Sequence, residues 1–115
     1  MPITILLIED ELLLLLDLQM AVEEAGHIEV SAGGVDAALK HLETRPIDVA
    51  ILDVHLGLSE TSFPIAKRLR EQNIPYLFYT AQPERLREEL MIADVPVIIK
   101  PADTDKIVAA AIALI

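Results

Sequence analysis

Three carboxylates and one ammonium group stand directly after short apolar stretches of this sequence: Glu9, Asp10, Asp53 and Lys100. Each stretch is unbroken, which is typical of a strand that is buried on both faces of a parallel sheet. In such sheets functional groups collect at the carboxyl edge of the strands. We therefore expect the four side chains to converge on one rim of the molecule. An acidic pocket of this kind suits a hard divalent cation such as Mg²⁺, with a fixed positive charge beside it.

The three acids can bind such a cation in different ways. Asp10 and Asp53 can supply charged oxygens, and Glu9 stands close enough to hold a metal-bound water. The backbone carbonyl of His55, in the segment after Asp53, can complete the protein ligands, while its imidazole is expected to face solvent. A cation in this place would bridge to a phosphoryl oxygen and offset the charge of an approaching anion.

The remaining polar residues fit the same chemistry. Lys100 can pair with a second phosphoryl oxygen, and the hydroxyl of Thr80, one step after another apolar stretch, can bind a third. Asp53 is then placed as a nucleophile that forms an acyl phosphate. Taken singly, each of these residues is also typical of a turn, a helix start or a solvated strand end. Their joint occurrence at four strand ends favours a phosphoryl site.

The elements that must position these residues alternate along the chain. The pattern predicts strands over 3–8, 28–32, 48–52, 76–79 and 97–99, and helices over 11–25, 35–44 and 62–72, with a last helix from Asp103 or Thr104. The segment 54–60 is predicted to be a loop. This alternation indicates βαβ crossovers and a doubly wound α/β fold, a five-stranded parallel sheet with helices on both faces. A fourth helix fits only within 84–92, so we expect it to be short or irregular.

Composition narrows the function. A chain of 115 residues is expected to form one domain, 1–115, with no second domain after the last helix. The absence of cysteine excludes disulfides and thiolate metal sites, and no apolar stretch approaches the ~20 residues of a membrane span. No secretory signal is recognisable, so a cytoplasmic protein is expected. The formal net charge of −10 argues against binding nucleic acid.

Together, Glu9-Asp10, Asp53, Thr80-Ala81 and Lys100-Pro101 resemble the receiver domain of two-component response regulators, over the whole chain. The resemblance implies a flavodoxin-like sheet of strand order 2-1-3-4-5 and a phosphorelay function. It implies that Asp53 is the phosphoacceptor, supplied by a phosphohistidine on a histidine kinase or a histidine phosphotransfer protein. The domain would catalyse only its own phosphorylation and dephosphorylation and would not otherwise be an enzyme.

The resemblance also assigns individual roles. Glu9 and Asp10 form the acidic pair, with Asp10 as the direct Mg²⁺ ligand. Thr80 and Lys100 sense the phosphoryl group, and the bond between Lys100 and Pro101 is expected to be cis.

Several positions depart from the usual receiver pattern. Val97 stands where many receivers carry an aromatic switch residue, Gly57 where many carry proline, and Ala102 where an aromatic residue often follows the Lys-Pro pair. The sequence around Thr80 is similar to a subfamily of single-domain receivers with a Phe-Ala-Thr-Gly segment, linked to general-stress phosphorelays. Here Tyr79 and Ala81 replace the alanine and glycine of that segment.

The periodicity of helix 11–25 predicts a docking surface independently of the family resemblance. At about 100° per residue, one arc should face the sheet: Leu14, Leu18, Ala21, Val22 and Ala25. Leu12, Leu16 and Met20 then point away from it, and we interpret them as a docking surface for a helix of the phosphodonor. Burial under a neighbouring loop, or scattered surface leucines, would give the same pattern. A weak homodimer through the face of the last helix is a further expected contact.

Two other functions stay open. A phosphatase or a Toprim-type enzyme also uses acids at strand ends, but both want a second carboxylate two residues after the first, where this chain has His55. A pseudo-receiver, which binds proteins without being phosphorylated, is kept open by Val97.

Overall fold

The computed structural model describes residues 2–57, 59–83, 86 and 95–115. Its main sheet comprises β1 (Thr4–Ile8), β2 (Ile28–Ala32), β3 (Val49–Leu52), β6 (Tyr76–Thr80) and β7 (Val97–Ile99). The helices are α1 (Leu12–Glu24), α2 (Val35–Thr44), α3 (Phe63–Glu71) and α5 (Thr104–Ile112). The fourth helix expected within 84–92 falls almost wholly outside the described residues.

The sheet has the order β2-β1-β3-β6-β7 and all its pairs are parallel, which confirms the predicted order 2-1-3-4-5. Its register aligns the carboxyl ends of the strands. Ile8, the last residue of β1, pairs with both Ala32 and Leu52, and Thr80 pairs with Ile99. The residues that follow these ends are therefore delivered to one edge of the sheet.

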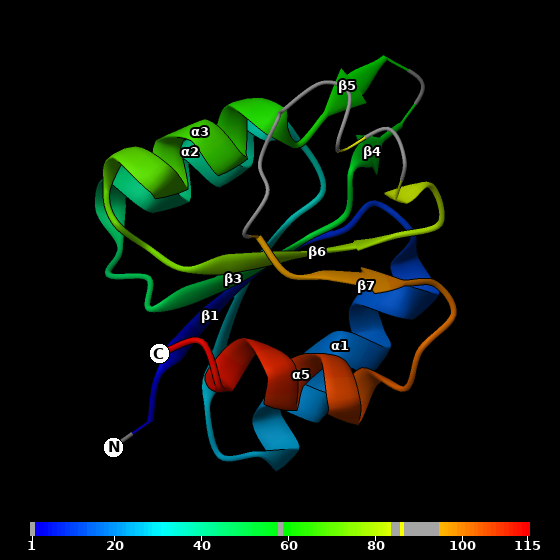
Figure 1. Ribbon diagram of the computed structural model, residues 1–115. Helices are drawn as coiled ribbons and strands as arrows, with labels where there is room; N and C mark the ends of the chain where they lie inside the picture. The colour runs from blue at the N-terminus through cyan, green and yellow to red at the C-terminus, as the bar shows by residue number, and fades with distance from the viewer. Residues whose placement is uncertain (1, 58, 84–85, 87–94) are drawn as a thin grey trace.

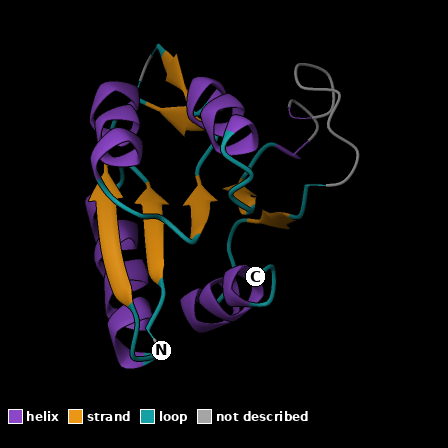
Figure 2. Cartoon of the chain, turned by 90° about the vertical axis from the view of Figure 1, so that its left-hand side faces the viewer, coloured by secondary structure: helices purple, strands orange, loops and turns teal. Residues whose placement is uncertain are grey.

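Helices cover both faces of the sheet. In Figure 1, α2 and α3 lie above the sheet and α1 and α5 lie below it, and Figure 2 shows the same two layers from the side. Along β1, Leu6 and Ile8 belong to the core under α2 and α3, whereas Ile5 and Leu7 belong to the core over α1 and α5. Burial on both faces explains why these strands read as unbroken apolar runs.

Helix α1 packs largely as its periodicity predicts. Leu18, Ala21 and Val22 are buried against the sheet and Leu14 is partly buried. The expectation for Ala25 was wrong, because this residue is exposed at the C-cap, where the helix has already ended. The chain then turns at Gly26, whose φ of 84° suits glycine.

The segment predicted to be a loop after β3 contains regular structure. An antiparallel ribbon pairs β4 (His55–Leu56) with β5 (Glu60–Thr61). Gly57 leaves β4 with φ 71°, a left-handed conformation that glycine adopts without steric cost. The Ser62 N–H donates to the carbonyl of Val54 at 2.9 Å, which ties the ribbon back to the end of β3.

The sequence predicts that the last helix starts at Asp103 or Thr104, and the structure identifies Asp103 as its cap. Asp103 is the N-cap of α5, and its Oδ1 accepts a hydrogen bond from the Asp105 N–H at 3.0 Å. Among the described residues, no helix has the length and apolar character needed to cross a membrane.

Candidate functional site

The three acids meet at the carboxyl edge of the sheet. One carboxylate oxygen from each of Glu9, Asp10 and Asp53 lies within 4.8 Å of the others. Backbone hydrogen bonds continue the sheet to this point, since the Asp53 N–H donates to Ile8 at 2.9 Å and the Glu9 N–H donates to Ala32 at 3.2 Å. Neighbouring strands therefore hold the acids.

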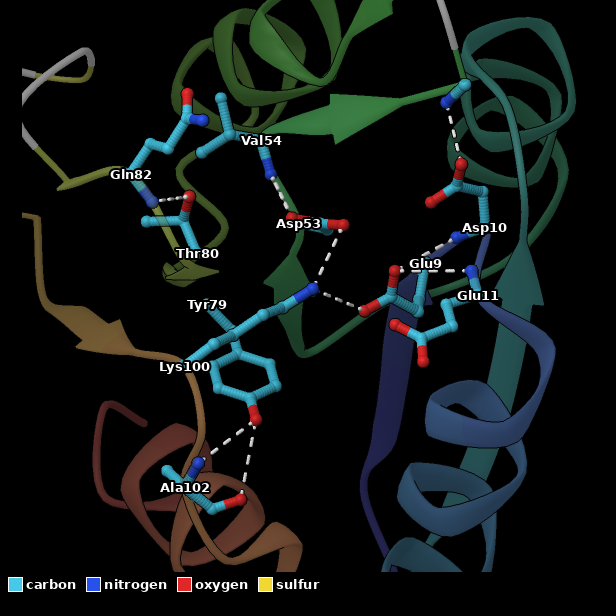
Figure 3. Close-up of polar contacts among 11 residues, drawn as sticks. Glu9, Asp10, Glu11, Asp53, Val54, Tyr79, Thr80, Gln82, Lys100 and Ala102 are labelled. Carbon is cyan, nitrogen blue, oxygen red and sulfur yellow. Dashed lines mark hydrogen bonds and ion pairs between the residues drawn. The ribbon is translucent and has the colours of Figure 1, made fainter.

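Lys100 reaches the same place from β7. Its Nζ lies 3.2 Å from Oε1 of Glu9 and 3.2 Å from Oδ2 of Asp53, so that one ammonium bridges the two carboxylates (Figure 3). The Lys100 N–H donates to the carbonyl of Thr80 at 2.9 Å, which attaches the base of the side chain to β6. The peptide bond between Lys100 and Pro101 is cis, the isomer that the sequence analysis expects.

Glu9 and Asp10 are neighbours in sequence but lie in different surroundings. Glu9 is 1% exposed, and its Oε2 accepts hydrogen bonds from the backbone N–H groups of Asp10 at 3.1 Å and Glu11 at 3.4 Å. Asp10 is exposed, and its Oδ2 accepts from the Gly57 N–H at 2.7 Å. The deep acid thus faces Lys100, while the outer acid contacts the ribbon and solvent.

The charges of the pocket shift two pKa values. Burial and the neighbouring Asp53 carboxylate raise the pKa of Glu9 to about 7, although Lys100 acts in the opposite direction. Burial alone would lower the pKa of Lys100, but the negative charges of Asp53 and Glu9 outweigh it and raise that pKa. At neutral pH Lys100 is therefore charged, and Glu9 is protonated in a substantial fraction of the molecules.

The donor set fits a hard divalent cation. Three carboxylates offer oxygen ligands at one point, and the exposure of Asp10 leaves that point accessible from solvent. On Asp53, Oδ1 accepts the Val54 N–H at 2.8 Å and Oδ2 accepts from Lys100, which fixes the orientation of this carboxylate.

Thr80 lies beside the acids without joining them. Its side chain is buried, and its Oγ1 accepts a hydrogen bond from the Gln82 N–H at 3.1 Å. Across the part of the chain that the structure describes, no hydrogen bond links this hydroxyl to the three carboxylates or to the Lys100 ammonium.

His55 departs from its expected environment. The imidazole was predicted to face solvent, but its Nε2 is buried and has no hydrogen-bond partner among the described residues. The reason is that the segment carrying it folds into the ribbon, where His55 pairs with Thr61. His55 thus starts the ribbon two residues after Asp53.

The predicted docking surface on α1 is exposed. Leu12, Leu16 and Met20 are 67%, 44% and 58% exposed, so no neighbouring loop buries them. Leu13, which the sequence analysis left out, is 73% exposed and extends the surface at the start of the helix. Helical periodicity could have found it, because at about 100° per residue Leu13 lies only about 60° around the helix from Leu16, on the arc that points away from the sheet.

Two contacts of the pocket were missed by the sequence analysis. The Gly57 N–H that contacts Asp10 comes from a backbone whose path depends on the ribbon. The ring of Tyr79 lies beside the Lys100 ammonium, at 5.2 Å from Nζ to the ring centroid. Tyr79 is visible in the sequence as a departure from the Phe-Ala-Thr-Gly segment, but no sequence pattern predicts its contact with Lys100.

Comparison with known proteins places these features in a family. The family model for the response regulator receiver domain matches residues 5–112. The alkaline phosphatase synthesis transcriptional regulatory protein PhoP of Bacillus subtilis (strain 168) is 33% identical over 88 residues, which are 75% of this chain. The chain spans only 36% of the length of that curated relative.

Solved structures agree with this match. SdrG of Sphingomonas melonis Fr1 is 35% identical, with a TM-score of 0.80, and the match covers 97% of this chain and 94% of SdrG. The chemotaxis response regulator CheY4 of Vibrio cholerae aligns over 100% of both chains with a TM-score of 0.85, and at 21% identity it supports the fold alone.

Proposed function

The chain belongs to the response regulator receiver family of two-component signalling, and from that premise we propose that Asp53 accepts a phosphoryl group from a phosphohistidine in a Mg²⁺-dependent reaction. Residues 1–115 would act as one receiver domain that catalyses only its own phosphorylation and dephosphorylation. The observation that carries the proposal is the position of Lys100, whose ammonium lies 3.2 Å from both Asp53 and Glu9. A lysine held there can bind an anion that arrives at Asp53.

The transfer step needs an oriented carboxylate. A carboxylate oxygen of Asp53 forms a bond to phosphorus as the P–N bond breaks in a phosphohistidine whose other ring nitrogen carries a proton, and the electron pair of that bond stays on the imidazole nitrogen. The product is an acyl phosphate on Asp53 and a neutral histidine on the donor. The hydrogen bond from the Val54 N–H holds the carboxylate in place while this happens.

Positive charge must accompany the incoming phosphoryl group, because two other acids, Glu9 and Asp10, already lie beside Asp53. Mg²⁺ held by Asp10, Asp53 and the backbone carbonyl of His55 would supply charge compensation when bound, with Glu9 holding a water in its shell. Lys100 binds one phosphoryl oxygen as it releases Asp53 Oδ2. The Thr80 hydroxyl, which also accepts the Gln82 N–H, donates to another.

The exposed surface of α1 suits the phosphodonor. Leu12, Leu16 and Met20 lie on the helix that follows Glu9 and Asp10 directly, so a partner docked there stands beside the pocket. We propose that a helix of a histidine kinase or a histidine phosphotransfer protein covers this surface.

Beryllofluoride, which resembles a phosphoryl group, tests the site directly. Purified protein should bind it only when Mg²⁺ is present, and Asp53→Asn should abolish binding, as measured by chemical shifts of backbone amides. Asp17→Asn, an equal change of charge at an exposed position of α1, is the matched control and should bind like the unmodified protein.

Other outcomes identify other functions. If the unmodified protein binds no beryllofluoride, the pocket is silent and the chain is a pseudo-receiver. If it releases phosphate from phosphomonoesters over many turnovers, the strand-end acids serve a phosphatase instead.

A further inference from the structure

Tyr79 is set apart from the other aromatic residues of this chain. The sequence has two phenylalanines and two tyrosines and no tryptophan. Phe63, Tyr76 and Phe78 pack against one another on the α2–α3 side of the sheet, with edge-to-face ring pairs at centroid distances of 6.5 and 5.7 Å. Tyr79 belongs to the core on the α1–α5 side. Its place beside the pocket is therefore not explained by the aromatic cluster.

The ring of Tyr79 contacts the functional lysine. Lys100 Nζ lies 5.2 Å from the ring centroid, within the range of a cation–π attraction. Tyr79 is only 3% exposed, so solvent screens this attraction weakly. Figure 3 shows the Lys100 side chain passing beside the Tyr79 ring as it extends toward Glu9 and Asp53.

The hydroxyl of Tyr79 contacts the segment after Lys100. It accepts a hydrogen bond from the Ala102 N–H at 3.2 Å and donates to the Ala102 carbonyl at 3.4 Å. One buried hydroxyl thus uses both backbone groups of Ala102 (Figure 3). The next residue, Asp103, caps helix α5, so the held segment runs from the pocket to the start of that helix.

These contacts restrain Lys100 at two points. The ring limits the paths open to a long and otherwise flexible side chain, and the hydroxyl fixes the backbone two residues later. A lysine side chain loses rotamer entropy when it is ordered, and a binding site that is ordered beforehand avoids that loss on binding.

We propose that Tyr79 is a positioning residue for Lys100 and that it sets the affinity of the pocket for a phosphoryl group. The ring and the hydroxyl both contribute, the first by holding the ammonium and the second by holding the Lys100–Ala102 segment. This inference rests on the proposed function of Asp53 and adds to it a residue that touches neither the phosphoryl group nor the metal ligands.

The first experiment removes only the hydroxyl. Tyr79→Phe should weaken Mg²⁺-dependent binding of beryllofluoride by about 3- to 10-fold, as expected for the loss of hydrogen bonds from a buried group. Its affinity for Mg²⁺ alone should not change, because the carboxylates are untouched. Tyr76→Phe, the same substitution on the opposite face of β6, is the matched control and should leave both affinities unchanged.

A contact readout separates local from global effects. The Ala102 amide proton should exchange with solvent faster in Tyr79→Phe, since its acceptor is gone, while amides in the middle of β1 should exchange as before. Tyr79→Leu, which also removes the ring, should lower beryllofluoride affinity further, by about another 3-fold.

A double variant tests whether the effect passes through Lys100. In a Lys100→Met background, Tyr79→Phe should cause no further loss in the rate of phosphorylation by a small phosphodonor. The inference would be overturned if Tyr79→Phe slowed phosphorylation as much in the Lys100→Met background as in the unmodified protein. It would also be overturned if Tyr79→Phe bound beryllofluoride as tightly as the unmodified protein. Either result would leave the proposed role of Asp53 as acceptor intact. Failure of the unmodified protein to bind beryllofluoride would instead refute the proposed function, and this inference with it.

Discussion

The buried Glu9 makes the stability of the metal-free protein depend on pH in an unusual direction. Its pKa is raised from an ordinary 4.5 to about 7 by burial and by Asp53. The folded state therefore binds more protons than the unfolded state between these two values, and stability must fall as pH rises through that window. Lys100 does not contribute to the pH dependence in this window. The stability that its raised pKa provides is fully present below the ordinary lysine pKa of 10.5 and is lost only as pH rises through the raised pKa.

The size of the effect follows from the two pKa values of Glu9. At about 1.4 kcal/mol per pKa unit, the ionisation of Glu9 removes about 3 kcal/mol from the free energy of unfolding. About 2 kcal/mol of this falls between roughly pH 5.5 and pH 8. Glu9→Gln, which stays neutral, should lose this dependence and be the more stable protein at the higher pH.

Urea unfolding with a chelator present, at both pH values, measures the effect. Because other groups also titrate, the quantity to compare is the difference between Glu9→Gln and the unmodified protein. Glu23→Gln, at an exposed position of α1, makes the same change of charge and should follow the unmodified protein. Parallel pH profiles for Glu9→Gln and the unmodified protein would refute the reasoning.

Mg²⁺ provides a second arm of the same experiment. A cation that binds only the folded state stabilises it in proportion to its occupancy, and it competes with the proton on Glu9. Mg²⁺ should therefore stabilise the unmodified protein more at about pH 8 than at about pH 5.5. Equal stabilisation at both values would show that Glu9 stays outside the metal site.

Three further predictions concern the surface and the turns. Leu16→Glu should fold normally but slow phosphotransfer from the partner. Ile28→Glu, at an exposed position at the amino end of β2, away from the pocket, should leave the transfer rate unchanged. Equal transfer kinetics of Leu16→Glu and the unmodified protein would contradict the α1 docking surface. Gly57→Ala should lower the free energy of unfolding by about 1 kcal/mol because φ is 71°, whereas Gly33→Ala, whose added Cβ would meet its nearest atom at 3.8 Å, should be nearly neutral in the same urea titration. Asp103→Ala should cost about 1 kcal/mol through loss of the cap on α5, and Asp103→Asn should restore most of it; equal losses would contradict the capping role.

Much of the site could be predicted because it depends on local patterns. An apolar run buried on both faces identifies a parallel strand, and parallel strands bring their carboxyl ends to one edge, so Glu9, Asp53 and Lys100 could be placed together before any contact was known. The same periodicity placed Leu18 and Val22 of α1 against the sheet. These inferences need only the repeat of side chains along one element.

Contacts between elements were decided by tertiary structure alone. The Gly57 N–H reaches Asp10 across 47 residues, and the Tyr79 hydroxyl reaches Ala102 across 23. Neither contact leaves a periodic trace, because each depends on how a turn or a loop is packed against a distant strand end. The ribbon that carries His55 was missed for the same reason.

The amino-acid pattern alone indicates which charged residues lie at the rim, because the carboxyl ends of parallel strands all lie at one edge of the sheet. Only the folded chain decided how deep each charge lies. Glu9 and Asp10 are adjacent acids of nearly equal chemistry, yet the extended backbone turns one inward to Lys100 and the other outward to the ribbon. That difference in depth raises the pKa of Glu9 and leaves Asp10 open to solvent, because the free energy of a charge depends on what surrounds it.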